Sequence, residues 1–267
     1  MSSHAERGSS QILSDDWTKT LHLQNDRTLE LHTQGGFHYR TRIPRFGRSL
    51  AYHFPSCDAL VGASGAEVYR LNLEQGRFLS PFVLQGDGAD DVAGVNVVDV
   101  NPAHQLLAFG MEAAGTVEFW DPRSRSRVGL LRLPKGRLMA STSSVAQALP
   151  GVDEPGALPG LSVTAIASRS DGLSYAIGTS TGHTLLYDIR SDKPFAIKDQ
   201  GYGLPVKNLT WISGGSRMAG DGLVMSADKK VIKIWDRNSV SISLVPHAPL
   251  LIKAFCSPPR TSPLSRR

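Results

Sequence analysis

The sequence is short of cysteine and of long apolar runs, and these two shortages exclude several classes of protein. Of its 267 residues, only Cys57 and Cys256 are cysteines, which gives neither the disulfide framework of a small secreted domain nor the spacing of a zinc site. No apolar run approaches the roughly 18 residues that predict a membrane span. The N-terminal residues also lack the apolar core of a signal peptide. We therefore expect a protein of an intracellular, reducing compartment that does not cross a membrane.

Metal-binding patterns are equally scarce. None of the eight histidines stands at metal-ligand spacing. His22 and His32 could lie opposite each other across a hairpin, but no third ligand accompanies them. Asp87, Asp90 and Asp91 lack the residue order and the terminal Glu of a calcium-binding loop, so a solvated loop is the better interpretation. We expect no metal site and no cofactor.

Residues 178–182 read Gly-Thr-Ser-Thr-Gly and formally match the nucleophile elbow of hydrolases. That elbow needs a strand before the serine and a helix after it. Here apolar strand patterns flank the segment on both sides, so we interpret it as a hairpin turn. The sequence offers no catalytic residue, and we expect that the protein is not an enzyme.

What the sequence does contain is one local pattern that recurs five times. Each copy has a stretch of small residues, a tight turn and an alternating apolar strand that ends near an aromatic and a polar residue. The copies are spaced by 48, 49, 67 and 48 residues when counted at Leu23, Leu71, Trp120, Tyr187 and Trp235. A period of about 40–45 residues with a Trp-Asp ending is typical of WD-type propeller blades. The sequence therefore predicts an all-β fold, a WD40-type β-propeller.

Within each unit the pattern predicts short strands and tight turns. In the clearest unit, strands are expected at 163–168, 174–178 and 183–187, separated by Gly, Asp and Ser residues. Such spacing leaves no room for helices. Ala176 and Gly178 are small, as expected where strands crowd near the axis of a propeller.

The aromatic-Asp pairs that end these strands are expected to be structural. In each, the aromatic ring should pack between blades and the Asp should cap the following turn. The Gly-His dipeptide usual before a WD blade is missing, so we expect an incomplete hydrogen-bond network inside the blades. The pairs are Trp120-Asp121, Tyr187-Asp188 and Trp235-Asp236.

The pattern also suggests how the chain is divided. We expect a disordered N-terminus at 1–11, a WD-repeat propeller region at 12–239, and a divergent, largely disordered tail at 240–267, in which 240–245 could still be a strand. The 67-residue step contains an excess of about 19 residues. It is assigned to a Ser- and Pro-containing insertion loop at 134–160.

The visible propeller is expected to be incomplete. Residues 20–23 and 28–32 are predicted to be the third and fourth strands of a blade whose first two strands are missing. Four to five blades are then visible, and an open propeller would expose sheet edges and apolar surface. We infer a fragment or a shortened product of a longer propeller protein, with a complete small propeller as the alternative.

Arginines gather in two segments of a chain whose net charge is +5. Guanidinium groups pair well with phosphate and stack on bases, although a solvated surface is the default interpretation of such runs. We predict that these residues contact RNA or another acidic partner: Arg40, Arg42, Arg45, Arg48, Arg123, Arg125 and Arg127.

Several segments match more than a generic blade. They occur in order over residues 12–239 and resemble the nucleolar protein 10 family, with Leu-Asn-Leu-Glu-Gln-Gly-Arg-Phe at 71–78 as the most specific run. The segments are 12–16, 39–48, 67–78, 117–123, 186–194 and 202–207.

This resemblance implies a nucleolar WD-repeat scaffold of the small-subunit processome, the particle that matures 18S ribosomal RNA. It implies location in the nucleus and nucleolus, with other ribosome-assembly proteins and pre-ribosomal RNA as partners and no small-molecule substrate. The family has an additional N-terminal section, further blades and a charged C-terminal region. After Ser239 the chain reads unlike the family, which suggests an alternative end.

Two other functions remain open at this point. A cytoplasmic propeller adaptor, such as a ubiquitin-ligase substrate receptor, would show the same blades. A propeller hydrolase would need acidic or histidine residues that converge on the central channel, and no spacing here offers them.

Overall fold

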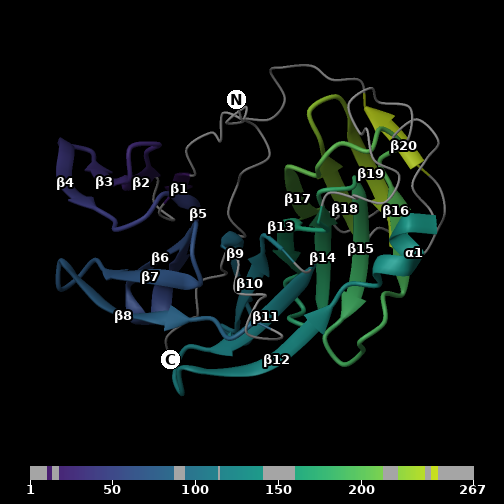
Figure 1. Cartoon of the computed structure of the whole chain (residues 1–267). Coiled ribbons are helices and arrows are strands. Elements are labelled where there is room, and N and C mark those ends of the chain that lie inside the picture. The colour runs from purple at the N-terminus through teal and green to yellow at the C-terminus, as the bar shows by residue number, and fades with distance from the viewer. Residues whose placement is uncertain are drawn as a thin grey trace, which may run out of the picture.

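The computed structural model describes residues 11–13, 18–86, 94–113, 115–140, 160–212, 222–237 and 242–245. Their strands form five four-stranded antiparallel sheets, and neighbouring strands in each sheet are consecutive in the chain. Figure 1 shows the sheets following one another from the purple to the yellow end of the chain. We number them blades 1 to 5 in chain order.

Blade 1 contains β1 (Gln11–Leu13), β2 (Thr20–Leu23), β3 (Thr28–Thr33) and β4 (Gly36–Arg42). Blade 2 contains β5 (Gly47–His53), β6 (Asp58–Ala63), β7 (Glu67–Asn72) and β8 (Arg77–Val83). Blade 3 contains β9 (Val95–Val100), β10 (Leu107–Met111), β11 (Thr116–Asp121) and β12 (Ser126–Arg132). Blade 4 contains β13 (Val163–Ser168), β14 (Ser174–Thr179), β15 (His183–Asp188) and β16 (Ala196–Asp199). Blade 5 contains β17 (Asn208–Ile212), β18 (Leu223–Ala227), β19 (Ile232–Asp236) and β20 (Ile242–Val245).

The first strand of each blade faces the first strand of the next. Strand β9 contacts β5 on one side and β13 on the other, and β13 also contacts β17. The first strands are therefore innermost, and the fourth strands form the outer edges. This is the arrangement of propeller blades around a central axis.

Small residues near the axis let neighbouring blades approach closely. An added Cβ on Gly110 of β10 would lie 2.5 Å from Val97 Cγ1 and 2.6 Å from Val163 Cγ1. On Gly178 of β14 it would lie 2.8 Å from the Val206 side chain. The expectation that Ala176 and Gly178 are small because strands crowd there is confirmed, since Ala176 is also fully buried.

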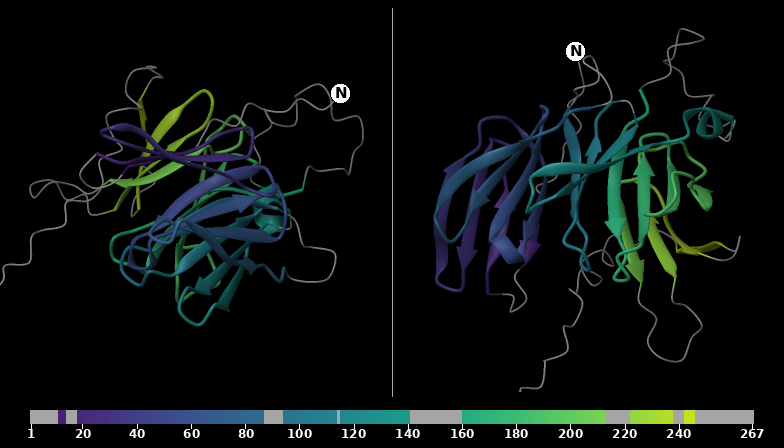
Figure 2. Two further views of the ribbon diagram at one scale, coloured as in Figure 1. Left: turned by 90° about the vertical axis from the view of Figure 1, so that its left-hand side faces the viewer. Right: turned by 90° about the horizontal axis from the view of Figure 1, so that it is seen from below.

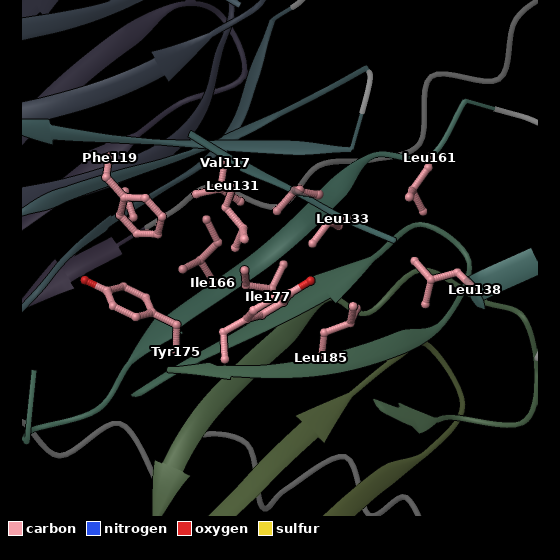
Figure 3. Packing of buried hydrophobic residues seen from close by; sticks show 13 residues of the cluster. Val117, Phe119, Leu131, Leu133, Leu138, Leu161, Ile166, Tyr175, Ile177 and Leu185 are labelled. Carbon is pink, nitrogen blue, oxygen red and sulfur yellow. The ribbon is translucent and has the colours of Figure 1, made fainter. Parts of the chain in front are cut away.

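The apolar cores lie between blades. Figure 3 shows the core between blades 3 and 4, where Phe119 and Tyr175 face each other with ring centroids 5.2 Å apart. Ile177 and Leu185 of blade 4 are fully buried in the same cluster. Because each Å² of buried apolar surface contributes about 25 cal/mol, such cores stabilise the packing of adjacent sheets.

Blade 1 differs from the prediction. Residues 20–23 and 28–32 are the second and third strands of a complete four-stranded sheet, not the third and fourth strands of a partial one. The strand that precedes them, and that the sequence did not predict, is β1, whose three residues pair with β2. A strand of three residues is too short to show the alternation on which a sequence-based prediction depends.

The unit at 163–187 contains strands and turns without a helix, as predicted, and two short helical segments lie elsewhere in the described residues. A 3₁₀ turn, η1, spans Phe54–Ser56, and a short α-helix, α1, spans Lys135–Ala140 inside the expected insertion loop. Leu138 of this helix is 1% exposed and packs with Leu133 and Leu161 in the core between blades 3 and 4 (Figure 3). A helix of six residues has no stability of its own, so this burial is what holds it.

The other predicted strands are confirmed. Those expected at 163–168, 174–178 and 183–187 are β13, β14 and β15, and the strand suggested within 240–245 is β20. Most of the expected N-terminal segment and tail, and residues 141–159 of the insertion, lie outside the described residues. Neither of the helical segments in the described ranges is long and apolar enough to span a bilayer.

Candidate interaction surfaces

The antiparallel order gives the blades two rims, which Figure 2 shows at the two ends of the strands. Rim I carries the connections that lead into each first strand and the turns between second and third strands. Rim II carries the turns between first and second and between third and fourth strands. Backbone hydrogen bonds link the rim I segments, for example from Ser64 N to Phe46 O (3.1 Å) and from Glu112 N to Gly94 O (2.7 Å). A partner that lies flat on one rim does not reach the other.

Buried polar side chains tie neighbouring blades together. Glu118 of β11 is fully buried and accepts hydrogen bonds from Gln85 N (3.2 Å) and Gly86 N (2.7 Å) in the connection that leaves blade 2. Asn101, after β9, donates to Gly172 O (2.9 Å) and Tyr175 Oη (2.6 Å) of blade 4. Because buried polar groups cost free energy when unpaired, these contacts fix the relative positions of the blades.

Three arginines of the first predicted cluster are exposed around the end of blade 1. Arg40 lies on the outer strand β4, with Nε 3.1 Å from Glu30 Oε1, and Arg42 ends the same strand. Arg45 lies on rim I, where its Cδ approaches the turn at Gly65. Arg40, Arg42 and Arg45 are therefore all accessible to a binding partner, as predicted for a contact surface.

An exposed aromatic ring accompanies them. Phe46 is 59% exposed, and the guanidinium carbon of Arg27 lies 5.4 Å from its ring centroid. Arg27 also donates to Pro44 O (3.2 Å), which holds it against the ring. Rim I therefore presents cationic and aromatic surface together at the junction of blades 1 and 2.

Arg48, the fourth arginine of the first predicted cluster, is largely buried between blades. Its side chain is only 13% exposed, and it pairs with Glu112 of blade 3 and donates to Asn96 Oδ1 (3.0 Å). Asn96 in turn donates to Val163 O (3.1 Å) of blade 4. Arg48 thus belongs to a chain of contacts across three blades rather than to the exposed surface.

The second predicted cluster lies on rim II. Arg123 and Arg125 are exposed in the turn between β11 and β12, where Asp121 accepts a hydrogen bond from Arg123 N (2.9 Å). Arg127 instead donates to Gly86 O (2.7 Å) and lies 3.4 Å from Glu118 Oε1. Five of the seven predicted arginines therefore form two separate exposed groups, whereas Arg48 and Arg127 contact neighbouring blades.

The predicted structural roles of the aromatic-Asp pairs are confirmed where the contacts are described. Trp120 and Trp235 are 4% and 2% exposed. The hydrogen bonds from Arg123 N to Asp121 and from Arg190 N to Asp188 (2.9 Å) cap the turns, and backbone donors lower the pKa of Asp121.

Blade 5 contains an internal hydrogen-bond network. The absence of the Gly-His dipeptide had led us to expect that such a network would be incomplete. The buried Gln200 donates from Nε2 to Ser226 Oγ (2.7 Å), and Trp235 Nε1 donates to the same oxygen (2.6 Å). A glutamine just before the blade therefore connects the rim I segment to strands β18 and β19.

Among the grooves formed by the described residues, two lie between blades. One of about 580 Å³ lies between blades 1 and 2 and is lined mostly by apolar side chains, among them Leu31, Tyr52 and Phe54. A smaller one of about 190 Å³ lies between blades 3 and 4, beside Tyr187 and Arg190.

The Gly-Thr-Ser-Thr-Gly segment is a hairpin turn, as predicted. It joins β14 to β15, Gly182 has φ of 85°, and His183 N donates to Thr179 Oγ1 (3.1 Å). His22 and His32 do lie together, with ring centroids 5.1 Å apart, but within the described ranges no group of three or more side chains could hold a metal ion. Asp87, Asp90 and Asp91 lie outside the described residues.

Asp99 of β9 is a half-buried residue whose carboxyl group accepts a hydrogen bond from Ser168 N (2.9 Å) of blade 4. Burial raises its pKa from 3.8 to about 6. A raised pKa in the folded state means that stability falls as pH rises from about 4 to about 6, because the folded protein must ionise a poorly solvated acid.

We expect Asp99→Asn to raise the free energy of unfolding by about 1–3 kcal/mol at pH 7.5. The amide keeps an acceptor for Ser168 N and carries no charge to bury. At pH 4 the two proteins should be nearly equal. Urea denaturation followed by tryptophan fluorescence at both pH values measures this difference, and an equal effect at both would contradict the assigned cause.

A further group of surface residues was missed by sequence reasoning. Tyr202 and Lys207 lie in the rim I connection between β16 and β17, and Lys229 and Lys230 lie in the rim I turn between β18 and β19. The Gly-Tyr-Gly and Lys-Lys runs are visible in the sequence. Their proximity is not, because it depends on the pairing of two connections far apart in the chain.

The chain is similar to proteins of one family. Residues 2–257 match the family described as nucleolar protein 10-like, N-terminal domain, whose name designates a β-propeller. Ribosome biogenesis protein enp2 homolog of Schizosaccharomyces pombe is 53% identical over 236 residues, which are 88% of this chain and 34% of that protein. Nucleolar protein 10 of Homo sapiens is 45% identical over 233 residues, which are 87% of this chain and 30% of that protein.

Ribosome biogenesis protein ENP2 of Saccharomyces cerevisiae is 44% identical over 255 residues, which are 92% of this chain and 32% of that protein. The chain thus spans about a third of the length of these relatives. The family match also continues to residue 257, past Ser239, where the repeat pattern fades. The relatives' names place the family in the nucleolus, in agreement with the location expected from the sequence.

A solved structure with the same fold is a chain in the crystal structure of the mitotic checkpoint complex. It aligns with a TM-score of 0.63 and 18% identity, over 89% of this chain and 62% of that chain. At this identity the likeness concerns the fold alone. With the five sheets and the family match, it confirms the predicted all-β, WD40-type propeller.

Proposed function

The chain belongs to the nucleolar protein 10-like family, and from this premise we propose that it is a non-enzymatic scaffold in ribosome biogenesis. Its particle is the small-subunit processome, and its role is to support maturation of 18S ribosomal RNA. The observation that carries the proposal is the family match over residues 2–257, together with relatives named as ribosome biogenesis proteins.

The inter-blade contacts support a scaffold. Glu118, Asn101 and Arg48 each link side chains or backbone of neighbouring blades, so loops on one rim keep fixed mutual positions. A surface of fixed geometry loses little conformational entropy when it binds. Other ribosome-assembly proteins are the partners that this arrangement would hold in register.

The exposed arginines are the proposed contacts to pre-ribosomal RNA. Arg40, Arg42 and Arg45 stand beside Phe46 at blade 1 and rim I, while Arg123 and Arg125 stand on rim II. Each phosphate that an arginine neutralises adds affinity that falls with salt. The two groups would therefore contact separate RNA segments, or one RNA segment and one acidic protein.

We expect a triple variant, Arg40→Ala, Arg42→Ala and Arg45→Ala, to recover several-fold less 18S precursor than the parent chain. The measurement is affinity purification of the tagged full chain from nuclear extract at two salt concentrations, with the precursor quantified by hybridisation. The difference between parent and variant should shrink at the higher salt concentration, because the parent makes more phosphate contacts and its affinity therefore falls more steeply with salt.

The matched control is Arg77→Ala with Lys135→Ala and Lys193→Ala, which removes three exposed positive charges elsewhere on the molecule. Equal recovery by parent, control and triple variant would contradict the arginine contacts. Failure of the parent chain to recover any precursor or assembly protein would contradict the scaffold proposal itself.

A further inference from the structure

The connection between β16 and β17 is a firmly anchored loop. Gln200 N donates to Gly182 O (2.9 Å), Val206 N donates to Thr179 O (3.1 Å), and Lys207 N donates to Ala227 O (2.7 Å). Gln200 and Val206 are fully buried. The loop between these anchors therefore has a defined conformation on rim I.

This loop presents an aromatic ring to solvent. Gly201 and Gly203 flank Tyr202 with φ of 84° and 62°, a backbone region that glycine adopts without steric cost. Tyr202 is 41% exposed, and Lys230 Nζ lies 5.3 Å from its ring centroid. An apolar ring held outward by two glycines is not explained by packing of the blade.

Positive charge surrounds the ring. Lys207, Lys229 and Lys230 are all exposed on the two adjoining rim I segments. The nearby carboxylates are turned to the backbone, since Asp199 accepts from Gly201 N (2.7 Å) and Asp228 accepts from Val231 N (2.6 Å). The three exposed lysines therefore outnumber the two carboxylates, and this surface carries an excess of positive charge.

We propose that Tyr202, Lys207, Lys229 and Lys230, which we name the Lys-Tyr patch, bind single-stranded RNA, with a base stacked on the tyrosine and phosphates beside the lysines. This inference rests on the proposed function only in taking RNA as the ligand. Single-stranded nucleic acid is held by such a pairing of aromatic platforms and cationic side chains.

The exposed ring favours RNA over an acidic protein segment. Lysines alone would attract either ligand, because their attraction to carboxylate and phosphate differs little in geometry. A ring beside them adds stacking, which every base offers and an acidic side chain does not. Because the ammonium of Lys230 lies over one face of the ring, a base would stack on the other face, with a phosphate close to this lysine.

The test is fluorescence anisotropy of a labelled 12-nucleotide oligouridylate titrated with the full chain between 50 and 200 mM salt. Tyr202→Ala should weaken binding by about 5- to 100-fold, and Tyr202→Phe, which keeps the ring, should stay within about twofold. Lys229→Ala with Lys230→Ala should flatten the plot of log affinity against log salt by about 1.4, at about 0.7 per phosphate contact on a single strand.

Arg77→Ala with Lys193→Ala serves as the charge-matched control, and thermal melting checks that each variant is folded. Equal weakening by this control and by the lysine variant, or unchanged binding by Tyr202→Ala, would overturn the proposal. Tighter binding of an oligoglutamate peptide than of oligouridylate, lost in the lysine variant, would overturn it in favour of an acidic protein. If the patch fails while the chain still co-purifies with 18S precursor, the proposed function stands without it.

Discussion

Glu118→Ala is expected to lower the free energy of unfolding by about 3–5 kcal/mol, the cost of breaking a buried ionic contact by removing one partner. Its carboxylate is fully buried and accepts from Gln85 N, Gly86 N and Trp120 Nε1, with Arg127 3.4 Å away. The substitution leaves these donors unpaired between blades 2 and 3. Urea denaturation followed by tryptophan fluorescence measures the loss.

Two variants make this result specific. Glu118→Gln keeps the side-chain shape and one acceptor oxygen, so it should fall between the parent and Glu118→Ala. Glu74→Ala removes an exposed carboxylate and should change stability by no more than about 0.5 kcal/mol. A loss below about 1 kcal/mol for Glu118→Ala would show that Glu118 does not hold the blades together.

Arg70→Met is expected to destabilise the protein by a similar amount, about 3–5 kcal/mol at pH 7. Arg70 is 7% exposed, and its Nε and Nη2 lie 3.1 and 2.6 Å from Asp58 Oδ2. Asn72 donates to the other oxygen of the same carboxylate (2.9 Å). The variant leaves a buried carboxylate without its cation.

The pH dependence identifies the cause. Burial alone would raise the pKa of Asp58, but hydrogen bonds from Arg70, Asn72 and Ser56 outweigh it and lower that pKa. The stability from this group is therefore present above the ordinary pKa of an aspartate and is lost as pH falls. Without Arg70 the carboxylate is protonated easily, so the cost of Arg70→Met should shrink between pH 7 and pH 4.

A second substitution provides the control. Asp58→Asn combined with Arg70→Met leaves no buried charge and should recover much of the lost stability at pH 7. A double variant as unstable as Arg70→Met alone would mean that lost packing of Arg70 against Phe82, 5.0 Å from its ring centroid, dominates instead.

The fold could be predicted because its signals are local. Trp120, Tyr187 and Trp235 lie near the ends of strands of similar length, at steps of 67 and 48 residues of which the longer contains the insertion. Asp121 and Asp188 each accept a hydrogen bond within their own turn. Such features depend on a few adjacent residues. Strand β1 and helix α1 gave no comparable signal, since their three and six residues are held by contacts to distant segments.

The interaction surfaces could be predicted only in part, because many of their contacts join segments that are far apart in the sequence. Arg40 and Arg123 are exposed as expected from a run of charges. Nothing near Arg48 in the sequence indicates Asn96 or Glu112 as its partners, and nothing near Arg127 indicates Gly86. The approach of Lys230 to Tyr202 likewise arises from the meeting of two connections on rim I.

The central claim is that the chain works as a scaffold within a pre-ribosomal particle. Its most direct test is gradient sedimentation of the tagged chain from nuclear extract, with and without ribonuclease, while 18S precursor RNA is probed in each fraction. The account predicts that the chain sediments with large particles that contain the precursor and shifts to lighter fractions after ribonuclease. Sedimentation as a light species in both samples, while a full-length relative travels with the precursor, would contradict it.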